Sequence, residues 1–574
     1  MFAAQKKILA YSIIMIIMTT AFTIAETHKK QAFNPKAAFS KLSLRQKIAQ
    51  LLVVAAISNE DKNKQFMALW GVKEAERLGH AAIENLIKNE HIGGVIYYGN
   101  NTTAEEQAAL TKRFQSLSKD IALFVTLDAE TDLYNRLDGK TVINYPCAMA
   151  IGATNDPQLA YKLGLELGKQ LKKIGVHIAF TPVVDVNNNP DNPIIGLRSF
   201  GSNKQLVAAM GTELMKGLQE VGIIACAKHF PGHGDTNKDS HLELPIIDHG
   251  LKRLQTIELY PFQKLINAGV KSIMLAHLEV PALEKQKGLA SSLSYAIATA
   301  LLQQKMQFKG LVITDALFMK GVTNSLKPGE IELKALQAGN DILLCPTDAT
   351  IAIDFIEQAV RDGKISEEEI NRKVMKVLRA KAEAFEHTSK VDEASAAKSI
   401  EEVLQSKSAK ELQETLYAKS MTLAKKSSKN PFKHDNNQKM ILAIQAQDSQ
   451  TAPVSPSGIK TFSVNSKNII IDDVINKLAK AQHVIVAIHT MNRSPGKNYG
   501  VSKSITELIS ALKNNGRQVT VVLFGTPYAM PLVKDADNIL VAYDNRPAAH
   551  KAVAEIISGK KLATGVLPVE VDFK

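Results

Sequence analysis

Short apolar segments alternate with longer amphipathic segments over much of the chain. The apolar segments are rich in β-branched residues, and they predict buried strands at residues 51–57, 93–98, 121–127, 176–184, 222–226, 272–275, 310–314 and 341–344. The amphipathic segments between them predict helices, for example at 156–174, 204–221, 251–268 and 294–303. Eight buried strands alternating with helices indicate an α/β fold, namely a (β/α)8 TIM-like barrel, with a doubly wound open sheet as the alternative.

The same alternation returns on a smaller scale near the C-terminus. Apolar segments at 440–444, 483–489, 518–524 and 538–543 predict the strands of a second α/β domain. We therefore expect a polar linker at 26–39, a barrel domain at 40–390, a helical linker at 391–437 and a smaller α/β domain at 438–574.

The N-terminal segment has the pattern of a targeting signal. Lys6 and Lys7 precede an apolar run at 8–17, and small residues around Ala25 resemble a cleavage site. This pattern predicts a signal peptide at 1–25, with an uncleaved membrane anchor as the alternative. We therefore expect an exported protein, periplasmic or extracellular.

The net charge and the cysteine content limit the classes of protein to which this chain could belong. The formal net charge is +13, but no nucleic-acid motif and no basic–aromatic interleaving accompany it. An exported basic protein is better suited to anionic cell-envelope polymers, although a solvated basic surface is an equally good interpretation. Cys147, Cys226 and Cys345 are odd in number and far apart, so they do not predict a disulfide framework.

Polar side chains follow several of the predicted barrel strands directly. Active sites of (β/α)8 barrels lie at the carboxyl ends of their strands, so these side chains are candidate site residues. They are Asp128, Asp185, Lys228, His229, His277 and Asp315.

The richest such stretch is the loop 228–241, KHFPGHGDTNKDSH. It contains three histidines and two aspartates, and its glycines and proline exclude a helix. A metal site built from His229, His233, Asp235, Asp239 and His241 is one interpretation. The spacing matches no zinc motif, and a neighbouring lysine disfavours a dication, so we expect no metal and no other cofactor.

The motifs together resemble glycoside hydrolase family 3, and within it the NagZ-type β-N-acetylglucosaminidases. The resemblance is carried by LDAE at 127–130, FTPVVDVNNNPDNPIIGLRSF at 180–200, the loop at 228–241, LAHLEVPAL at 275–283, SSLS at 291–294 and VITDALFM at 312–319. The chain departs from the family pattern DxEGGRVxR, since DAETDLYNR at 128–136 lacks both glycines and the first arginine.

The resemblance implies a role for each matching residue. Asp315 matches the nucleophile, and His241 matches the acid/base, with Asp239 as the partner that would raise the histidine pKa. The implied sugar-binding residues are Asp128, Arg136, Arg198, Lys228 and His229.

These roles predict a retaining exo-β-N-acetylglucosaminidase that removes terminal β-GlcNAc, most plausibly from muropeptides or other peptidoglycan fragments. The alternatives are another family 3 β-hexosidase such as a β-glucosidase, a phosphorylase, or a non-catalytic saccharide-binding envelope protein. We expect no nucleic-acid partner, and membrane contact only through an uncleaved N-terminal segment.

Overall fold

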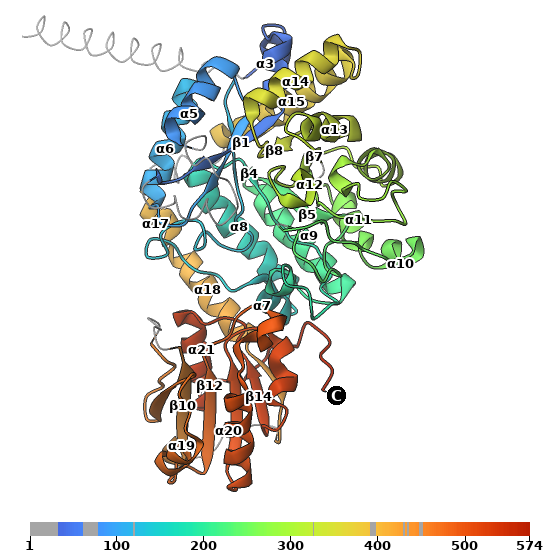
Figure 1. Cartoon of the computed structure of the whole chain (residues 1–574). Coiled ribbons are helices and arrows are strands. Elements are labelled where there is room, and N and C mark those ends of the chain that lie inside the picture. Colours follow the sequence, from blue (N-terminus) through green and yellow to red (C-terminus); the bar gives the residue numbers. More distant parts are fainter. Residues whose placement is uncertain are drawn as a thin grey trace, which may run out of the picture.

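In the computed structural model the chain forms two domains, the larger above the smaller in Figure 1. The structure describes residues 33–60, 79–118, 121–240, 242–324, 326–390, 398–428, 431–432, 436–446 and 452–573. The predicted signal peptide at 1–25 and the predicted acid/base His241 lie outside these described residues.

The larger domain is built around a sheet of eight strands in the order β7-β6-β5-β4-β3-β2-β1-β8, with parallel neighbours. The two ends of the sheet meet, because Thr314 N donates a hydrogen bond to Ile342 O and Ile313 forms a parallel bridge with Ile342. The predicted barrel is therefore confirmed, and the open sheet is excluded. The strands are β1 (Leu52–Ile57), β2 (Gly94–Tyr98), β3 (Phe124–Leu127), β4 (Ile178–Ala179), β5 (Ile224–Phe230), β6 (Ser272–Leu275), β7 (Leu311–Thr314) and β8 (Leu343–Leu344).

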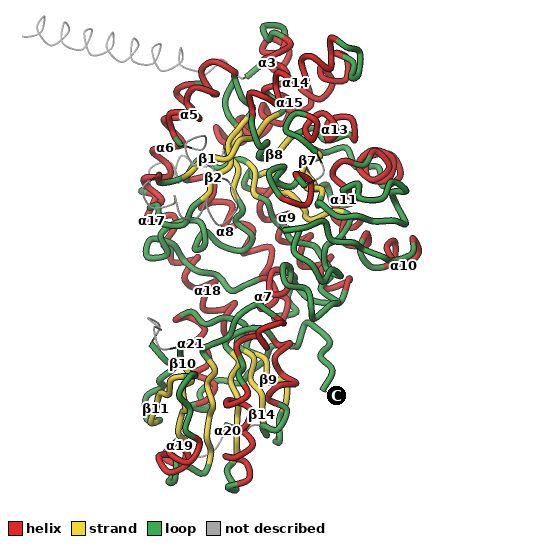
Figure 2. Tube along the Cα trace, viewed as in Figure 1, coloured by secondary structure: helices red, strands yellow, loops and turns green. Residues whose placement is uncertain are grey.

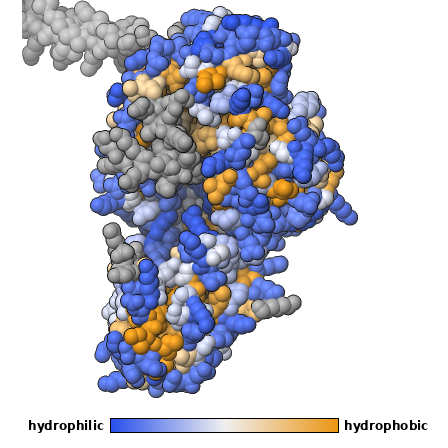
Figure 3. Space-filling model, viewed as in Figure 1, coloured by the Kyte–Doolittle hydropathy of each residue, from blue (hydrophilic) through white to orange (hydrophobic). Residues whose placement is uncertain are grey.

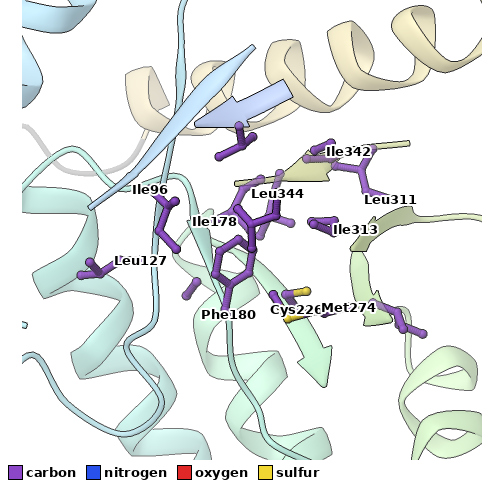
Figure 4. Packing of buried hydrophobic residues seen from close by; sticks show 14 of the residues in the cluster. Ile96, Leu127, Ile178, Phe180, Cys226, Met274, Leu311, Ile313, Ile342 and Leu344 are labelled. Carbon is purple, nitrogen blue, oxygen red and sulfur yellow. The ribbon is translucent and has the colours of Figure 1, made fainter. Parts of the chain in front are cut away.

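Side chains from different strands meet inside the barrel and fill it (Figure 4). Ile178, Phe180 and Ile313 are completely buried, and Leu344 is 2% exposed. Each fully buried side chain of this kind contributes roughly 1.5–3 kcal/mol to folding. Helices cover the outer side of the strands, so every residue of β1 is buried and its sequence is continuously apolar.

Two of the helices outside the barrel, α8 (Pro157–Lys173) and α9 (Lys204–Glu220), pack closely against each other (Figure 2). Their backbones approach at Gly217, where a Cβ atom would lie 2.2 Å from Tyr161 O. The other helical elements of this domain are α2 (Pro35–Phe39), α3 (Leu44–Ala49), α5 (His80–Asn85), η2 (Leu86–Glu90), α6 (Ala104–Leu117), α7 (Ala148–Ala153), η3 (Gly196–Arg198), α10 (Leu251–Thr256), α11 (Leu259–Asn267), η4 (Ser291–Leu293), η5 (Ala296–Lys305), α12 (Lys320–Thr323), α13 (Glu330–Ala338), α14 (Ala349–Arg361) and α15 (Glu367–Lys390).

The smaller domain contains a six-stranded sheet in the order β11-β10-β12-β13-β14-β9. Its strands are parallel except β9, which pairs antiparallel with β14 at the edge. Apolar clusters cover both faces of the sheet. The strands are β9 (Thr422–Lys425), β10 (Lys439–Gln445), β11 (Lys460–Asn465), β12 (His483–Ile488), β13 (Gln518–Leu523) and β14 (Asn538–Val541). The helical elements of this part of the chain are α17 (Ile400–Leu404), α18 (Lys407–Ser420), η6 (Asn436–Gln438), α19 (Ile471–Lys477), η7 (Pro495–Gly500), α20 (Lys503–Asn514), η8 (Pro527–Val533) and α21 (Pro547–Ile557).

Loops that follow the strands of the second sheet contact the barrel. Tyr499 OH donates a hydrogen bond of 2.8 Å to Pro190 O, and Tyr528 OH donates one of 2.9 Å to Asn187 O. The C-terminal segment adds a hydrogen bond of 2.8 Å from Val566 N to Ala153 O. The carboxyl ends of both sheets therefore meet at the junction between the domains.

The face of the molecule shown in Figure 3 is mostly hydrophilic, with hydrophobic atoms gathered in separate patches on both domains. Individually exposed apolar side chains, such as Leu562 at 63% and Ile470 at 62%, are ordinary for a protein surface. Within the described ranges, no helix is long and apolar enough to cross a membrane.

Candidate active site

A cavity of about 440 Å³ opens at the carboxyl ends of the barrel strands. Six of the predicted site residues line it, namely Asp128, Arg136, Arg198, Lys228, His229 and Asp315. Ser240, which lies between Asp239 and His241 in the sequence, also lines this cavity. A larger groove of about 750 Å³ lies where β7 and β8 begin, and none of the predicted site residues lines it.

Lys228, near the end of β5, is the charged centre of the cavity. Its Nζ lies 2.7 Å from Asp128 Oδ1 and 3.0 Å from Glu130 Oε1, and the residue is 2% exposed. Burial alone would lower the pKa of Lys228, but the two carboxylates raise it. Burial would likewise raise the pKa of Asp128, whereas Lys228 and Arg136 lower it. These groups therefore remain ionised and hold one another in place.

Two arginines complete this network from the loops after β3 and β4. Arg198 donates two hydrogen bonds to Glu130, with Nε 3.0 Å from Oε2 and Nη2 2.6 Å from Oε1. Burial would raise the pKa of Glu130, but Arg198 and Lys228 lower it well below its usual value. Arg136 Nε donates to Asp128 O over 2.9 Å. Charged side chains held this rigidly are suited to hydrogen-bonding sugar hydroxyl groups.

Asp185, which is completely buried, orients two histidines. Its Oδ2 lies 2.7 Å from His229 Nδ1, and its Oδ1 accepts a hydrogen bond of 2.7 Å from His233 N. Arg198 Nη2 lies 3.3 Å from His229 Nε2, and because a guanidinium only donates, Nε2 is the acceptor. His229 therefore carries its proton on Nδ1 and donates it toward Asp185.

The loop that carries the predicted acid/base is braced by His233. His233 Nδ1 lies 3.0 Å from Thr236 Oγ1, and His233 Nε2 lies 3.0 Å from Ser240 Oγ. Burial lowers the pKa of His233 to about 4, so the ring is neutral at pH 7. Asp239 O accepts backbone hydrogen bonds from the turn that follows. These contacts hold Ser240 and the turn that begins at Asp239 in place.

The side chains of His229, His233 and Asp235 in this loop have separate partners. Asp235 Oδ2 lies 2.8 Å from His249 Nε2 and 3.3 Å from Arg253 Nη2, away from the Asp185–His229 pair. Among the described residues, no group of three or more His, Cys, Asp or Glu side chains could hold a metal ion.

Asp315 follows β7 immediately, and hydrogen bonds hold both its backbone and its carboxylate. Asp315 N donates a hydrogen bond of 2.8 Å to Leu275 O, and Asp315 Oδ1 accepts one of 2.8 Å from Ala316 N. His277 does not line the cavity; its Nε2 donates to Ala316 O over 3.0 Å, and its Nδ1 lies 2.7 Å from Ser292 Oγ. His277 therefore supports the backbone beside Asp315.

The second domain adds two arginines to the cavity wall, Arg493 and Arg546. Arg546 Nη1 lies 2.6 Å from Asp132 Oδ2, and the Arg546 guanidinium lies 4.6 Å from the centre of the Tyr134 ring. Asp132 and Tyr134 belong to the segment that departs from the family pattern. Residues at which this chain departs from the family pattern therefore contact the second domain.

Sequence reasoning did not identify Arg493 and Arg546 as site residues. A usable signal existed, because Arg493 follows β12 and Arg546 follows β14, and the carboxyl ends of parallel strands are the usual place for a site. Asp185 was identified at a strand end, but its role in orienting His229 and His233 depends on the three-dimensional arrangement.

Comparisons with known proteins identify the family of this chain. Residues 43–380 match the family described as the glycosyl hydrolase family 3 N terminal domain. Beta-hexosaminidase A of Pseudoalteromonas piscicida is 28% identical over 553 residues, which are 85% of this chain and 91% of that protein. Beta-hexosaminidase LpqI of Mycobacterium tuberculosis (strain ATCC 25618 / H37Rv) is 30% identical over 348 residues, which are 59% of this chain and 83% of that protein.

A solved structure of a glycoside hydrolase family 3 β-N-acetylglucosaminidase from Paenibacillus sp. str. FPU-7 shares both domains. It is 28% identical, with a TM-score of 0.76, and the similarity covers 93% of this chain and 100% of that chain. A solved structure of the beta-glucoside phosphorylase BglX is 21% identical with a TM-score of 0.78, and this likeness shows the fold alone. The chain therefore belongs to glycoside hydrolase family 3, and it is a glycoside hydrolase of the NagZ type.

Proposed function

We propose that this protein is an exported, retaining exo-β-N-acetylglucosaminidase that removes terminal β-GlcNAc from peptidoglycan fragments. One observation carries the proposal: Asp315 and Ser240, which lies between Asp239 and His241, line the same cavity as the Asp128–Glu130–Lys228 network. A nucleophile, an acid/base segment and a sugar-binding network would thus face one sugar ring. The names of the β-hexosaminidase relatives support the choice of β-GlcNAc.

In this mechanism, Asp315 attacks the anomeric carbon while the acid/base protonates the leaving oxygen. A covalent α-linked glycosyl–enzyme results, and the leaving group departs as an alcohol. The same acid/base then removes a proton from water, which attacks the anomeric carbon and restores Asp315. We assign the acid/base role to His241, with Asp239 stabilising its protonated form.

The fixed charged side chains around the sugar would lower the activation barrier of hydrolysis because they orient the sugar. Lys228, Arg198 and their carboxylate partners are already held in place, so binding costs little side-chain entropy. His229 carries its proton on Nδ1, toward Asp185, and its Nε2 already accepts from Arg198. The ring and Arg198 therefore form one preorganised unit in the wall of the cavity.

The substrate assignment is tested with aryl glycosides of β-GlcNAc and β-glucose, assayed with and without inorganic phosphate. We expect hydrolysis of the β-GlcNAc glycoside at a rate that phosphate does not change. Formation of a sugar 1-phosphate would instead make the protein a phosphorylase, and faster release from β-glucose would make it a β-glucosidase. No turnover of either substrate would support a saccharide-binding protein.

The two catalytic roles are separated by azide rescue. Asp315→Ala should lose at least about 1,000-fold in kcat, and azide should restore turnover with an α-glycosyl azide as product. His241→Ala should slow the hydrolysis of substrates with poor leaving groups about 100-fold or more, and azide should yield the β-glycosyl azide. Asp362→Ala, on the exposed surface, serves as the control. Normal turnover by His241→Ala would remove the acid/base assignment.

The proposed location rests on the N-terminal sequence and on the net charge of +13. A positively charged protein outside the cytoplasm is attracted to anionic envelope polymers, which contain the proposed substrate. Fractionation of cells that produce the full chain, followed by N-terminal sequencing of the mature protein, tests this part. Recovery of the uncleaved chain in the cytoplasm would contradict export.

A further inference from the structure

Among the charged side chains that line the cavity, one arginine differs from the rest. Four of the five cations are ion-paired: Arg136 and Lys228 with Asp128, Arg198 with Glu130, and Arg546 with Asp132. Arg493, the fifth, forms no ion pair and no side-chain hydrogen bond with any residue that the structure describes. Its charge is therefore available to a ligand.

The loop that carries Arg493 is fixed in place. Asn492 N donates a hydrogen bond of 2.9 Å to Tyr499 O, and Ser494 N donates one of 2.9 Å to Asn492 Oδ1. Tyr499 OH in turn donates to Pro190 O on the barrel. The loop thus holds Arg493 at the junction between the domains, on the wall of the cavity.

The position of Arg493 indicates which part of a substrate it would meet. The Lys228 side chain is 3% exposed and lies deep in the cavity, where the terminal sugar would bind. Arg493 is exposed and lies at the mouth, on the wall supplied by the second domain. An exo-acting enzyme directs the leaving-group half of its substrate toward the mouth, so that half would pass Arg493.

We infer that Arg493 binds a carboxylate on the leaving-group half of the substrate. The inference rests on the proposed function and specifies the class of leaving group. A guanidinium presents a planar fork that matches a carboxylate with two charge-assisted hydrogen bonds, whereas the hydroxyl groups of a neutral sugar offer it only uncharged acceptors. The second domain would then select substrates whose leaving sugar is acidic, while the barrel recognises the terminal sugar.

The test compares two disaccharides that differ in one carboxylate. The acidic substrate carries β-GlcNAc on a sugar with a lactyl carboxylate, and the neutral one is its methyl amide. We expect wild type to prefer the acidic substrate, and Arg493→Ala to lower kcat/KM about tenfold for this substrate alone. Arg493→Lys should retain part of the preference, because the charge remains but the fork is lost. Raising the salt concentration to about 0.5 M should also reduce the preference.

The matched control is Lys497→Ala, which removes an equal charge from the same loop but does not line the cavity. It should leave the substrate preference unchanged, and unaltered melting temperatures should show that all variants fold. Equal effects of Arg493→Ala on the two substrates, or the same loss in Lys497→Ala, would overturn this inference while the proposed function stands. If wild type hydrolyses neither disaccharide, the proposed function fails and the inference fails with it.

Discussion

Arg546 Nη1 lies 2.6 Å from Asp132 Oδ2, and this ion pair joins the second domain to the loop after β3. The Asp132 side chain is 3% exposed and the Arg546 side chain 19%. Burial raises the pKa of Asp132 even though Arg546 opposes this effect. The pair is therefore largely dehydrated, and either partner would be costly to leave alone.

Asp132→Ala should destabilise the protein by roughly 3–5 kcal/mol, because it leaves Arg546 buried without its main partner. The free energy of unfolding, measured with urea, checks this value. Since Arg546 also lines the cavity, KM should rise in the same variant. Lys407→Ala is the control, because Lys407 pairs with Glu411 on the surface and is 90% exposed. A loss of unfolding free energy no larger than that of the control would mean that the Asp132–Arg546 pair does not hold the domains together.

Glu130→Gln should make the stability less dependent on pH in the acid range. Arg198 and Lys228 lower the pKa of Glu130 well below its ordinary value of 4.5, so the folded state favours the ionised form. The resulting stability is fully present above pH 4.5 and is lost as the pH falls through the folded-state pKa. Wild type should therefore exceed Glu130→Gln in unfolding free energy at pH 7, and the difference should shrink below pH 4.5.

Thermal unfolding of both proteins between about pH 3 and pH 7 measures this difference. Glu507→Gln provides the reference, because Glu507 is 50% exposed and forms its ion pair with Lys503, which is 89% exposed. A difference between wild type and Glu130→Gln that stays constant with pH would contradict the charged network.

Asp185→Asn should lower kcat/KM about 10-fold to 100-fold without removing a group that lines the cavity. Asp185 accepts hydrogen bonds from His229 N, His229 Nδ1 and His233 N, and an amide offers only one oxygen to these donors. His229 should then lose its fixed tautomer, which nitrogen NMR of the ring detects. Asp191→Asn, exposed on the neighbouring loop, should change neither the rate nor the spectrum. An unchanged His229 signal in Asp185→Asn would rule out the orienting role.

The barrel and its strand-end residues could be predicted because local chemistry sets them. Asp128 and Asp315 each follow a buried apolar run, and the structure places both at one cavity, after β3 and β7. Lys228 and His229 lie inside β5, which continues to Phe230 and is longer than its apolar part predicts. A polar residue can belong to a barrel strand when its side chain points into a site rather than into the core.

Other elements could not be predicted from the local pattern of apolar and polar residues. The segment 391–437 was expected to be a helical linker, yet it supplies β9, whose pairing with β14 spans more than a hundred residues. The predicted helix at 251–268 is divided into α10 and α11, and Glu258 at the break pairs with Arg253. The helix predicted at 294–303 is the π-helix η5, and apolar spacing alone does not distinguish this form.

The brace behind the acid/base segment gives a further prediction. Thr236 Oγ1 lies 3.0 Å from His233 Nδ1 and 3.3 Å from Asn192 Nδ2, and the residue is 1% exposed. Thr236→Val keeps the shape but removes the hydroxyl, so the His233 ring loses one of its two hydrogen-bond partners. Because Ser240 bonds the other side of that ring, the segment Asp239–His241 should become less ordered.

We expect Thr236→Val to lower kcat about tenfold while KM changes little, since the segment acts on the leaving oxygen rather than on sugar binding. Thr236→Ser, which keeps the hydroxyl, should remain within about twofold of wild type. Hydrolysis of substrates whose leaving groups need little protonation should be slowed less, because their departure depends less on the acid. If Thr236→Val instead raised KM and left kcat unchanged, the loop would serve sugar binding and not proton transfer.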